Sequence, residues 1–395
     1  MHKEKKLTLS ILLANLFLAF LGIGLVIPVL PTIMNELAID GTIVGYMVAV
    51  FALVQLIASP IAGRWADKYG RKRMIIIGLV IFGLSEFLFG IGKSVEVLFI
   101  SRMLGGLSGA FIMPAVTAFI ADITTVQERS KALGYMSAAI NTGFIIGPGF
   151  GGFLAEIGTR LPFYVASILG MLAAILSLFL LKEPERSEET SVIGNVDFRG
   201  RYKIIFKPIY FIALLLIFIS SFGLSAFESL FSLFIDHKFG FSPKDIAIMI
   251  TGGGIVGAVV QLFLFDYLAK KIGEISLVRW CLIFSAIVVF VMTIVNHYFT
   301  ILLTTFIVFA GFDLIRPAIT TYLSKVAGSE QGFIGGMNST FTSIGNIFGP
   351  IIGGRLFDVN LNYPYYFSVL VLVIGIVLCL FWKNPEMSTK TIQRG

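Results

Sequence analysis

Charged residues are scarce in this sequence. Asp, Glu, Lys and Arg together make up 13% of its 395 residues, whereas hydrophobic residues make up 57% and the mean hydropathy is +0.92. A soluble chain of this length cannot bury so much apolar surface around one core, whereas a lipid bilayer accepts it. The composition therefore excludes a soluble globular protein and indicates a membrane protein.

Cysteine is also nearly absent. The two cysteines, Cys281 and Cys379, lie inside apolar segments, which excludes a disulfide framework. A cleavable leader is not expected either, because the first apolar segment, roughly Leu7 to Pro31, is too long for a signal-peptide core and no small-residue cleavage site follows it. We interpret it as a retained helix.

Apolar segments of about 20 residues, enough to cross a bilayer, recur along the whole chain. Nothing in the pattern suggests the shorter alternating strands of a barrel, so all of them are predicted to be helices. The fold class is therefore an all-α membrane protein with twelve transmembrane helices. The predicted spans are 7–31, 42–64, 73–92, 96–121, 132–157, 161–181, 208–235, 245–269, 275–295, 299–322, 331–357 and 363–382.

The basic residues are distributed unequally between the two sides of the predicted membrane. Of the 30 Lys and Arg residues, 22 fall in the termini and alternate loops on one side, and five fall in the opposite loops. Because positive residues accumulate on the cytoplasmic side, both termini are predicted to be cytoplasmic. The net charge of +7 is then a topology signal and does not indicate nucleic-acid binding.

An internal repeat divides the chain into two halves. A glycine-proline pattern recurs at a constant offset of 202 residues, and a polar stretch lies between the two six-span halves. We predict an N-terminal six-helix bundle at 1–182, a cytoplasmic linker at 183–207 and a C-terminal bundle at 208–395. Two related halves are typical of secondary transporters. The repeated residues are Gly134, Gly143, Gly147, Pro148, Gly151 and Gly152, matched by Gly336, Gly345, Gly349, Pro350, Gly353 and Gly354.

Several of these motifs resemble the major facilitator superfamily. The loop Gly63–Arg73 is similar to that family's signature between its second and third helices, and Arg102 with Gly106 and Gly109 resembles its fourth-helix motif. The pattern from Gly134 to Gly152 resembles the fifth-helix motif of drug/proton antiporters. Within the superfamily the chain is most similar to the Gram-positive multidrug pumps of the NorA, Bmr and Blt group. The second copy of the loop departs from the signature, since Lys270 stands where Asp67 would map.

Charged residues at membrane depth are the candidates for function, because burying each one costs at least about 2.5 kcal/mol. Glu228 has no charged residue within one helical turn, so it could exchange a proton for a cationic substrate. Asp313 and Arg316 are three residues apart and can pair on one helix face. That pair is either static, or Asp313 accepts a proton while Arg316 tunes how strongly it is held.

The first half contributes two further charges, Arg102 and Glu86. Arg102 does not readily release its proton, so its expected work is to hold polar groups or water. The roles left open for Glu86 are packing and coupling. The predicted proton-coupling set is Glu228, Asp313, Arg316 and Arg102.

A gate and a glycine motif complete the predicted machinery. In the loop, the gating set is Gly63, Asp67, Gly70 and Arg71, with Asp67 placed near a helix N-terminus and its dipole. The resemblance implies that such a contact closes the cytoplasmic side. The antiporter motif is Gly143, Gly147, Pro148, Gly151 and Gly152, whose small and kinking residues allow close helix packing and could resist leakage.

Polar and aromatic residues inside the spans are candidates for the substrate site, although inter-helix hydrogen bonds explain the polar ones equally well. This set is Phe20, Gln55, Asn141, Phe144, Glu228 and Asn338. The glycine run Gly252–Gly257 fits a dinucleotide-binding pattern but lies in a predicted span without a βαβ context, so it is rejected. No cofactor, metal site or nucleophile–base set is expected, and we do not expect an enzyme.

The sequence therefore predicts a proton-coupled multidrug efflux antiporter that exports lipophilic, often cationic molecules by alternating access. One alternative is an exporter dedicated to a single physiological solute such as a polyamine, and a membrane-embedded enzyme is a third hypothesis. The expected setting is a bacterial plasma membrane, which the chain crosses many times. The expected partners are small-molecule substrates, protons and membrane lipid, with no nucleic acid, and the chain is expected to function as a monomer.

Overall fold

The computed structural model describes residues 3–184, 208–327 and 331–382, and most of the predicted linker lies outside these ranges. The described residues are almost entirely helical, with no strand among them. The helices of the first half are α1 (Lys3–Val26), α2 (Leu30–Glu36), α3 (Gly41–Tyr69), α4 (Arg71–Ile91), α5 (Val95–Ile123), α6 (Val126–Ile157) and α7 (Leu161–Leu180). The helices of the second half are α9 (Pro208–Phe239), α10 (Pro243–Ile272), α11 (Glu274–Ile294), α12 (Tyr298–Ala327), α13 (Gln331–Val359) and α14 (Tyr363–Phe381).

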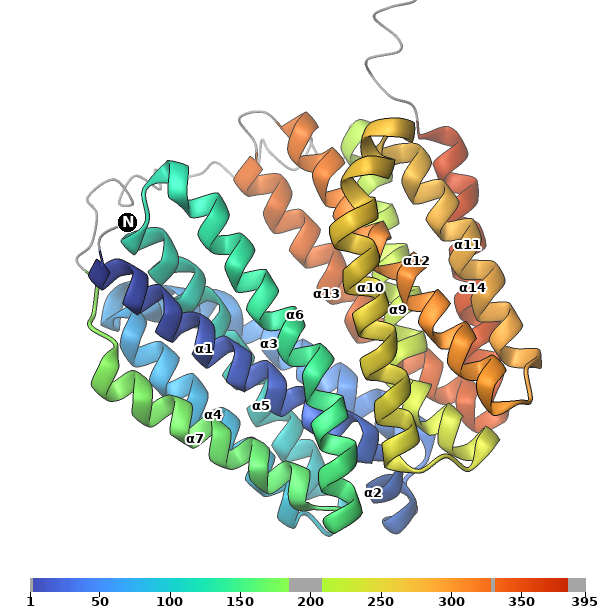
Figure 1. Cartoon of the computed structure of the whole chain (residues 1–395), viewed down its shortest axis with the longest axis horizontal. Coiled ribbons are helices and arrows are strands. Elements are labelled where there is room, and N and C mark those ends of the chain that lie inside the picture. The colour runs from blue at the N-terminus through green and yellow to red at the C-terminus, as the bar shows by residue number, and fades with distance from the viewer. Residues whose placement is uncertain (1–2, 185–207, 328–330, 383–395) are drawn as a thin grey trace, which may run out of the picture. The chain divides into compact units, whose positions relative to one another are not determined.

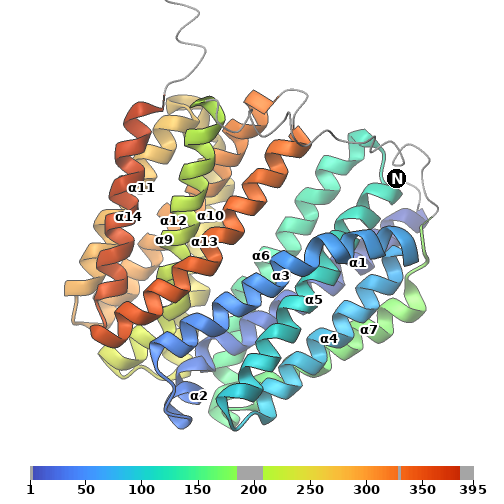
Figure 2. The ribbon, with the colours of Figure 1, turned by 180° about the vertical axis from the view of Figure 1, so that it is seen from behind.

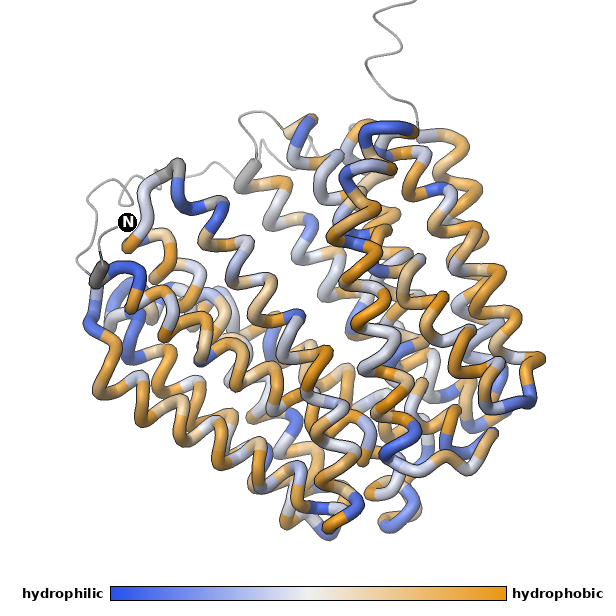
Figure 3. Tube along the Cα trace, viewed as in Figure 1, coloured by the Kyte–Doolittle hydropathy of each residue, from blue (hydrophilic) through white to orange (hydrophobic). Residues whose placement is uncertain are grey.

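Eleven of the twelve predicted spans each fall on one of these helices, and the first, 7–31, covers most of α1 and the start of α2, so the predicted all-α membrane fold is confirmed. Within the described residues, eleven helical segments are long and apolar enough to cross a membrane, and Figure 3 shows their hydrophobic character. The helix α13 falls short of that standard because Gly, Ser, Thr and Asn replace apolar residues along it. The sequence prediction at 331–357 is thus right about the helix and overstates its hydropathy.

Proline and glycine set the helix boundaries. The first span is interrupted by a 3-10 turn at Ile27–Val29, since Pro28 lacks a backbone donor. Gly70 and Gly273, with φ of 107° and 78°, separate α3 from α4 and α10 from α11. Glycine adopts positive φ without steric cost, so each long helix can turn sharply into the next. Polar side chains also stabilise helix starts. At the start of α3, the Asp40 side chain accepts a hydrogen bond from the Ile43 N–H at 2.8 Å.

The chain divides into two compact units. The first contains Met1–Ile193 and Ser232–Thr251, and the second contains Gly194–Phe231 and Gly252–Gly395. In the first unit α1 packs along α6 and α7, and α4 packs against α5 and α7 (Figures 1 and 2). In the second unit α11 packs against α12 and α14. The division at 1–182 and 208–395 stays a prediction.

The first unit includes the C-terminal end of α9 and the N-terminal end of α10. Asn35, in α2, donates to the Asp236 carboxylate at 2.9 Å, and Lys244 pairs with Glu156, in α6, at 3.1 Å. Gly152, in α6, faces the start of α10 so closely that an added Cβ would overlap Ala247. Both polar pairs are partly exposed, so we expect each to contribute less than about 1 kcal/mol.

Candidate functional site

The glycines of the predicted antiporter motif form a packing seam between α1 and α6. A Cβ added at Gly143 would stand 2.8 Å from the Leu21 nitrogen, and one at Gly147 would stand 2.6 Å from the Leu21 oxygen. Gly151 faces the Leu25 backbone so closely that a Cβ would overlap it. These three glycines let the two helix backbones touch, which dispersion forces and Cα–H contacts stabilise where water is absent. We call this contact the first glycine seam.

The second unit repeats the seam between α9 and α13. A Cβ added at Gly345 would stand 2.8 Å from the Phe222 nitrogen, and one at Gly349 would stand 2.6 Å from the Phe222 oxygen. Gly353 approaches the Ala226 oxygen at 3.2 Å. Because positions separated by 202 residues make equivalent contacts in each unit, the sequence repeat is a repeat of backbone packing.

Three of the predicted substrate residues line one cavity of about 240 Å³ in the first unit. Phe20, Gln55 and Phe144 come from α1, α3 and α6, and the rings of Phe20 and Phe144 meet edge to face with centroids 5.1 Å apart. Glu86 and Arg102 line the same cavity. The cavity therefore combines an aromatic wall with polar groups, which is the usual composition of a small-molecule site. Asn141 is exposed on α6 and is not among its lining residues.

The charges in this cavity neutralise each other. The Arg102 Nη2 lies 3.4 Å from the Glu86 Oε1, and the guanidinium carbon lies 4.4 Å from the centre of the Phe89 ring. The serines that directly precede Glu86 and Arg102 set this geometry. The Ser85 hydroxyl donates to the Ser101 carbonyl at 2.8 Å, and the Ser101 hydroxyl donates to the Ser85 carbonyl at 2.9 Å. These reciprocal bonds fix α4 against α5, so the next residue on each helix meets its partner.

Two carboxylates of the second unit have no such partner. Glu228, in α9, and Asp313, in α12, make no ion pair within the described part of the chain. Glu228 is exposed although its neighbours Phe227 and Leu230 are buried. A carboxylate at membrane depth that is neither paired nor sealed by its neighbours is stable only when it is protonated or faces water.

Asp313 and Arg316 make no ion pair within the described residues, and a role for both in proton coupling stays a prediction. The Asp313 carboxylate lies against Gly257 of α10, so closely that a Cβ there would overlap its Oδ2, whereas Arg316 is exposed. The spacing of three residues places both side chains on neighbouring faces of α12, but the glycine on α10 leaves space that only the shorter side chain occupies. The glycine run Gly252–Gly257 therefore serves helix packing against α12.

Asn338 contacts the same helix. Its amide nitrogen lies 3.4 Å from the Thr320 hydroxyl of α12, and within the described residues its buried Oδ1 has no hydrogen-bond partner. Thr320 is one helical turn beyond Arg316, so Asn338 contacts the face of α12 that also carries Arg316. The contact is an inter-helix hydrogen bond, which is the simpler of the two interpretations of its sequence.

Three of the predicted gate residues join two others in what we call the first corner: Asp67, Gly70 and Arg71 with Asp122 and Glu183. Arg71, the first residue of α4, pairs with Asp67 in the last turn of α3 and with Asp122 at the end of α5, where Nε and Oδ2 are 3.2 Å apart. The Glu183 carboxylate accepts hydrogen bonds from the Arg71 and Lys72 N–H groups, the second at 3.1 Å. Gly63 packs loosely against Pro114, with 3.9 Å to an added Cβ.

The sequence predicts Asp67 near a helix N-terminus, but the first N–H groups of α4 are taken by Glu183. A carboxylate there satisfies two orphan donors and meets the positive end of the helix dipole. Gly70 makes the contact possible, since an added Cβ would stand 2.8 Å from the Glu183 carboxyl carbon. Neither Glu183 nor Asp122 was singled out from the sequence, because no local spacing links either of them to the loop.

The second unit contains an equivalent corner with exchanged charges. Glu274, the first residue of α11, pairs with Lys325 near the end of α12, and both lie 203 residues beyond Arg71 and Asp122. Lys270 lies at the same offset from Asp67, and Gly273 from Gly70. We call Lys270, Gly273, Glu274 and Lys325 the second corner. What the sequence presents as a departure from the signature is a corner in which the charges equivalent to Asp67, Arg71 and Asp122 are all reversed.

Groups that could bind a metal or take part in disulfide chemistry do not gather in the described residues. No cluster of three or more His, Cys, Asp and Glu side chains is placed to hold a metal ion there. Cys281 and Cys379 are buried free thiols, as the sequence indicated.

Comparison with known proteins finds a matching family and relatives that are similar over nearly the whole chain. The model described as Major Facilitator Superfamily matches residues 12–234 and 213–395. The chain is 66% identical to "Multidrug resistance protein 1" of Bacillus subtilis (strain 168), over 97% of this chain and 98% of that one. It is 48% identical to "Quinolone resistance protein NorA" of Staphylococcus aureus (strain COL), over 96% and 97%.

Several solved structures have a fold similar to that of this chain. A bacterial homolog of the human lysosomal transporter Spinster, in an inward-facing and unoccupied conformation, superposes with a TM-score of 0.81 at 17% identity, covering 97% of each chain. The nucleoside transporter NupG superposes with a TM-score of 0.76 at 14% identity, covering 96% of this chain and 98% of that one. At such low identity these likenesses concern the fold alone.

Proposed function

Because the chain belongs to the Major Facilitator Superfamily, we propose that it is a proton-coupled antiporter that exports lipophilic, often cationic small molecules. The family and the structural neighbours are transporters, so the chain is not an enzyme. It is a multi-pass membrane protein. The names of the relatives, which refer to multidrug and quinolone resistance, support drug export with a broad substrate range. In this proposal the chain acts as a monomer in a bacterial plasma membrane, with both termini in the cytoplasm.

The observation that carries the proposal is the contrast between the buried charges of the two units. In the first unit Arg102 and Glu86 form a pair at 3.4 Å, which leaves no net charge to exchange. In the second unit Glu228 and Asp313 lack an ion-pair partner among the described residues. An unpaired carboxylate can be neutralised either by a proton or by a cationic substrate, so the two compete for it. That competition is the chemical basis of antiport.

Energy then comes from proton entry. Moving one charge down the membrane potential supplies about 2.3 kcal/mol per 100 mV, which can drive the export of a bound cation when both use the same carboxylate. Alternating access exposes Glu228 and Asp313 to each side of the membrane in turn. The aromatic wall of Phe20 and Phe144 contributes apolar contacts for the lipophilic part of a substrate.

The test is dye transport in proteoliposomes with an imposed pH gradient. Glu228→Gln keeps the shape of the side chain and removes its titration, so proton-driven efflux of a cationic dye should fall to the level of empty liposomes while protein abundance is unchanged. Asp266→Asn is the matched control, because Asp266 is an exposed carboxylate at the end of α10 and its change should leave transport intact. A well-folded Glu228→Gln variant that still couples dye efflux to the gradient would refute the mechanism.

A further inference from the structure

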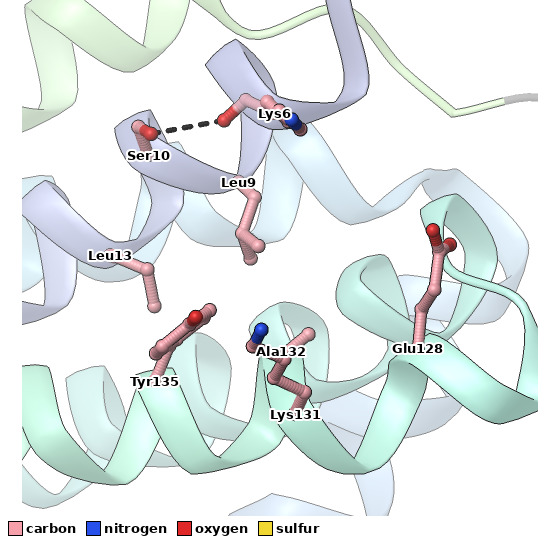
Figure 4. A pocket seen from close by; sticks show the side chains of 8 residues that line it. All are labelled: Lys6, Leu9, Ser10, Leu13, Glu128, Lys131, Ala132 and Tyr135. Atoms are coloured by element: carbon pink, nitrogen blue, oxygen red, sulfur yellow. Dashed lines mark hydrogen bonds between the residues drawn. The ribbon is translucent and has the colours of Figure 1, made fainter. Parts of the chain in front are cut away.

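A groove lies between the N-terminal ends of α1 and α6, away from the cavity described above. Figure 4 shows the two helices facing each other across it, with side chains from both pointing into the space between them. Its volume is about 730 Å³. We call it the α1–α6 groove; it is lined by Lys6, Leu9, Ser10, Leu13, Glu128, Lys131, Ala132 and Tyr135.

The groove exists because the first glycine seam holds the two helices together only farther along their length. Gly143 and Gly147 bring the backbones into contact, whereas an added Cβ at Gly134 would meet nothing within 4 Å. The helices therefore separate toward their N-terminal ends, as Figure 1 shows. The buried side chains of Leu9 and Ala132 form an apolar floor between them.

The position of the groove along the helices matches the boundary of a membrane. Lys6 and Lys131 lie within the first two turns of α1 and α6, ahead of the apolar residues of each helix, which is where a spanning helix meets the headgroups. Leu13 is seven residues beyond Lys6, which places it about 10 Å deeper at 1.5 Å per residue. The groove is thus polar at its mouth and apolar toward the membrane interior.

The polar end of the α1–α6 groove carries two positive charges, those of Lys6 and Lys131. Neither Lys6 nor Lys131 makes an ion pair with any side chain in the described part of the chain, and Lys131 lies 5.9 Å from the centre of the Tyr135 ring. The Glu128 carboxylate is turned back to the start of α6, where it forms a capping box with Thr125. Two free ammonium groups repel a cationic drug, so this groove is not a part of the proposed substrate site.

From this arrangement we infer that the α1–α6 groove binds the headgroup of an acidic phospholipid. The phosphodiester lies between Lys6 and Lys131, within reach of the Ser10 and Tyr135 hydroxyls, and an acyl chain runs over Leu9 and Leu13. Basic pockets between transmembrane helices on the cytoplasmic side are suited to such headgroups. A free phosphate would use the lysines but leave the apolar floor uncovered.

The lysines are not needed for the packing of these helices. In the second unit, the positions 202 residues beyond Lys131 and Tyr135 are Phe333 and Met337, although the glycine seam is retained. If these lysines served only to set the membrane topology, their side chains would extend into water, and no groove would be needed next to them. The basic mouth is therefore a property of the first unit alone.

The experiment uses the full chain in detergent and measures bound lipid by native mass spectrometry, with thermal melting as a second readout. Phosphatidylglycerol should bind and raise the melting temperature, while phosphatidylcholine with the same acyl chains should not. Since each lysine near a membrane surface contributes about fivefold to the binding of acidic lipid, Lys6→Gln with Lys131→Gln should weaken phosphatidylglycerol binding roughly 25-fold. Arginine at both positions should restore it.

Lys271→Gln is the matched control, because Lys271 also lies beside a tyrosine, Tyr267, but outside the groove. This control should bind phosphatidylglycerol like the wild type. The inference is overturned if the double glutamine variant binds phosphatidylglycerol as tightly as the wild type, or if phosphatidylcholine binds equally well. It is also overturned if millimolar inorganic phosphate displaces the lipid, which would assign the lysines to a free anion. Transport activity enters none of these readouts, so the result is independent of the proposed function.

Discussion

In the first corner Arg71 at the start of α4 pairs with Asp122 at the end of α5, whereas in the second corner Glu274 at the start of α11 pairs with Lys325 at the end of α12. Both corners follow a glycine with positive φ, and both join the same two elements of the repeat. The charge of each member is reversed. Local folding thus requires opposite charges at these two positions and does not require a particular sign at either.

The two corners differ in burial. In the first, the side chains of Arg71 and Asp122 are 11% and 3% exposed, and Glu183 adds a third carboxylate at the helix start. In the second, Lys325 is 64% exposed. A buried pair is costly to break because it leaves an uncompensated charge, whereas an exposed pair is screened by water. We therefore expect the first corner to be the more sensitive of the two.

The largest effect is expected from Asp122→Lys, which places a second cation beside Arg71. Breaking a largely buried pair in this way should lower the free energy of unfolding by about 3 kcal/mol and reduce dye efflux strongly. Thermal melting of the purified protein measures the first quantity and proteoliposome transport the second. Asp266→Lys makes the same charge change at an exposed position and should alter melting little. Equal melting of the two variants would remove the distinction between the corners.

Rebuilding the first corner with the charges of the second would sharpen the comparison. The triple variant Asp67→Lys, Arg71→Glu, Asp122→Lys reproduces the order found at Lys270, Glu274 and Lys325, so the lost melting temperature should largely return. The Glu183 carboxylate would then face a second carboxylate at position 71 in place of a guanidinium, so we expect full recovery only when Glu183→Gln is added. Transport should remain impaired in the rebuilt variant if the sign of this corner is used for gating. Recovery of both stability and transport would show that the sign carries no function.

A smaller effect is expected from Glu183→Gln alone. The amide can still accept one hydrogen bond from the start of α4 but no longer meets the helix dipole with a full charge. The cost should be about 0.5–1 kcal/mol in the free energy of unfolding, and raising the salt concentration should reduce it. Melting at low and high salt measures this difference. A cost that does not change with salt would indicate that the hydrogen bonds alone matter.

The smallest effect is expected from Lys325→Glu, which opposes Glu274 in the second corner. Because Lys325 is 64% exposed, its pair should contribute less than about 1 kcal/mol. The melting temperature should therefore fall less than in Asp122→Lys. If Lys325→Glu destabilises the protein as much as Asp122→Lys does, burial is not what separates the two corners.

Hydropathy and spacing alone were sufficient to predict a helix at each of the twelve spans, the offset of 202 residues and the free buried thiols, but not the break that separates α1 from α2. These features depend on local properties of the chain, because a long apolar segment is stabilised by lipid whichever helix lies beside it. The glycine seams were predicted for the same reason, since small residues at a constant offset indicate close packing without naming the partner helix. Phe20, Gln55 and Phe144 line one cavity, and their part in substrate binding stays a prediction.

Only the tertiary structure decided how the charges pair. Glu86 meets Arg102 because two serines fix α4 against α5, and Asp313 turns away from Arg316 because Gly257 on another helix provides space for it. Glu183 reaches the start of α4 from more than a hundred residues away. Each of these contacts depends on the rotation of one helix against another, which hydrophobic periodicity does not specify. The sequence determined which segments enter the membrane, and helix packing determined which charges remain free to work there.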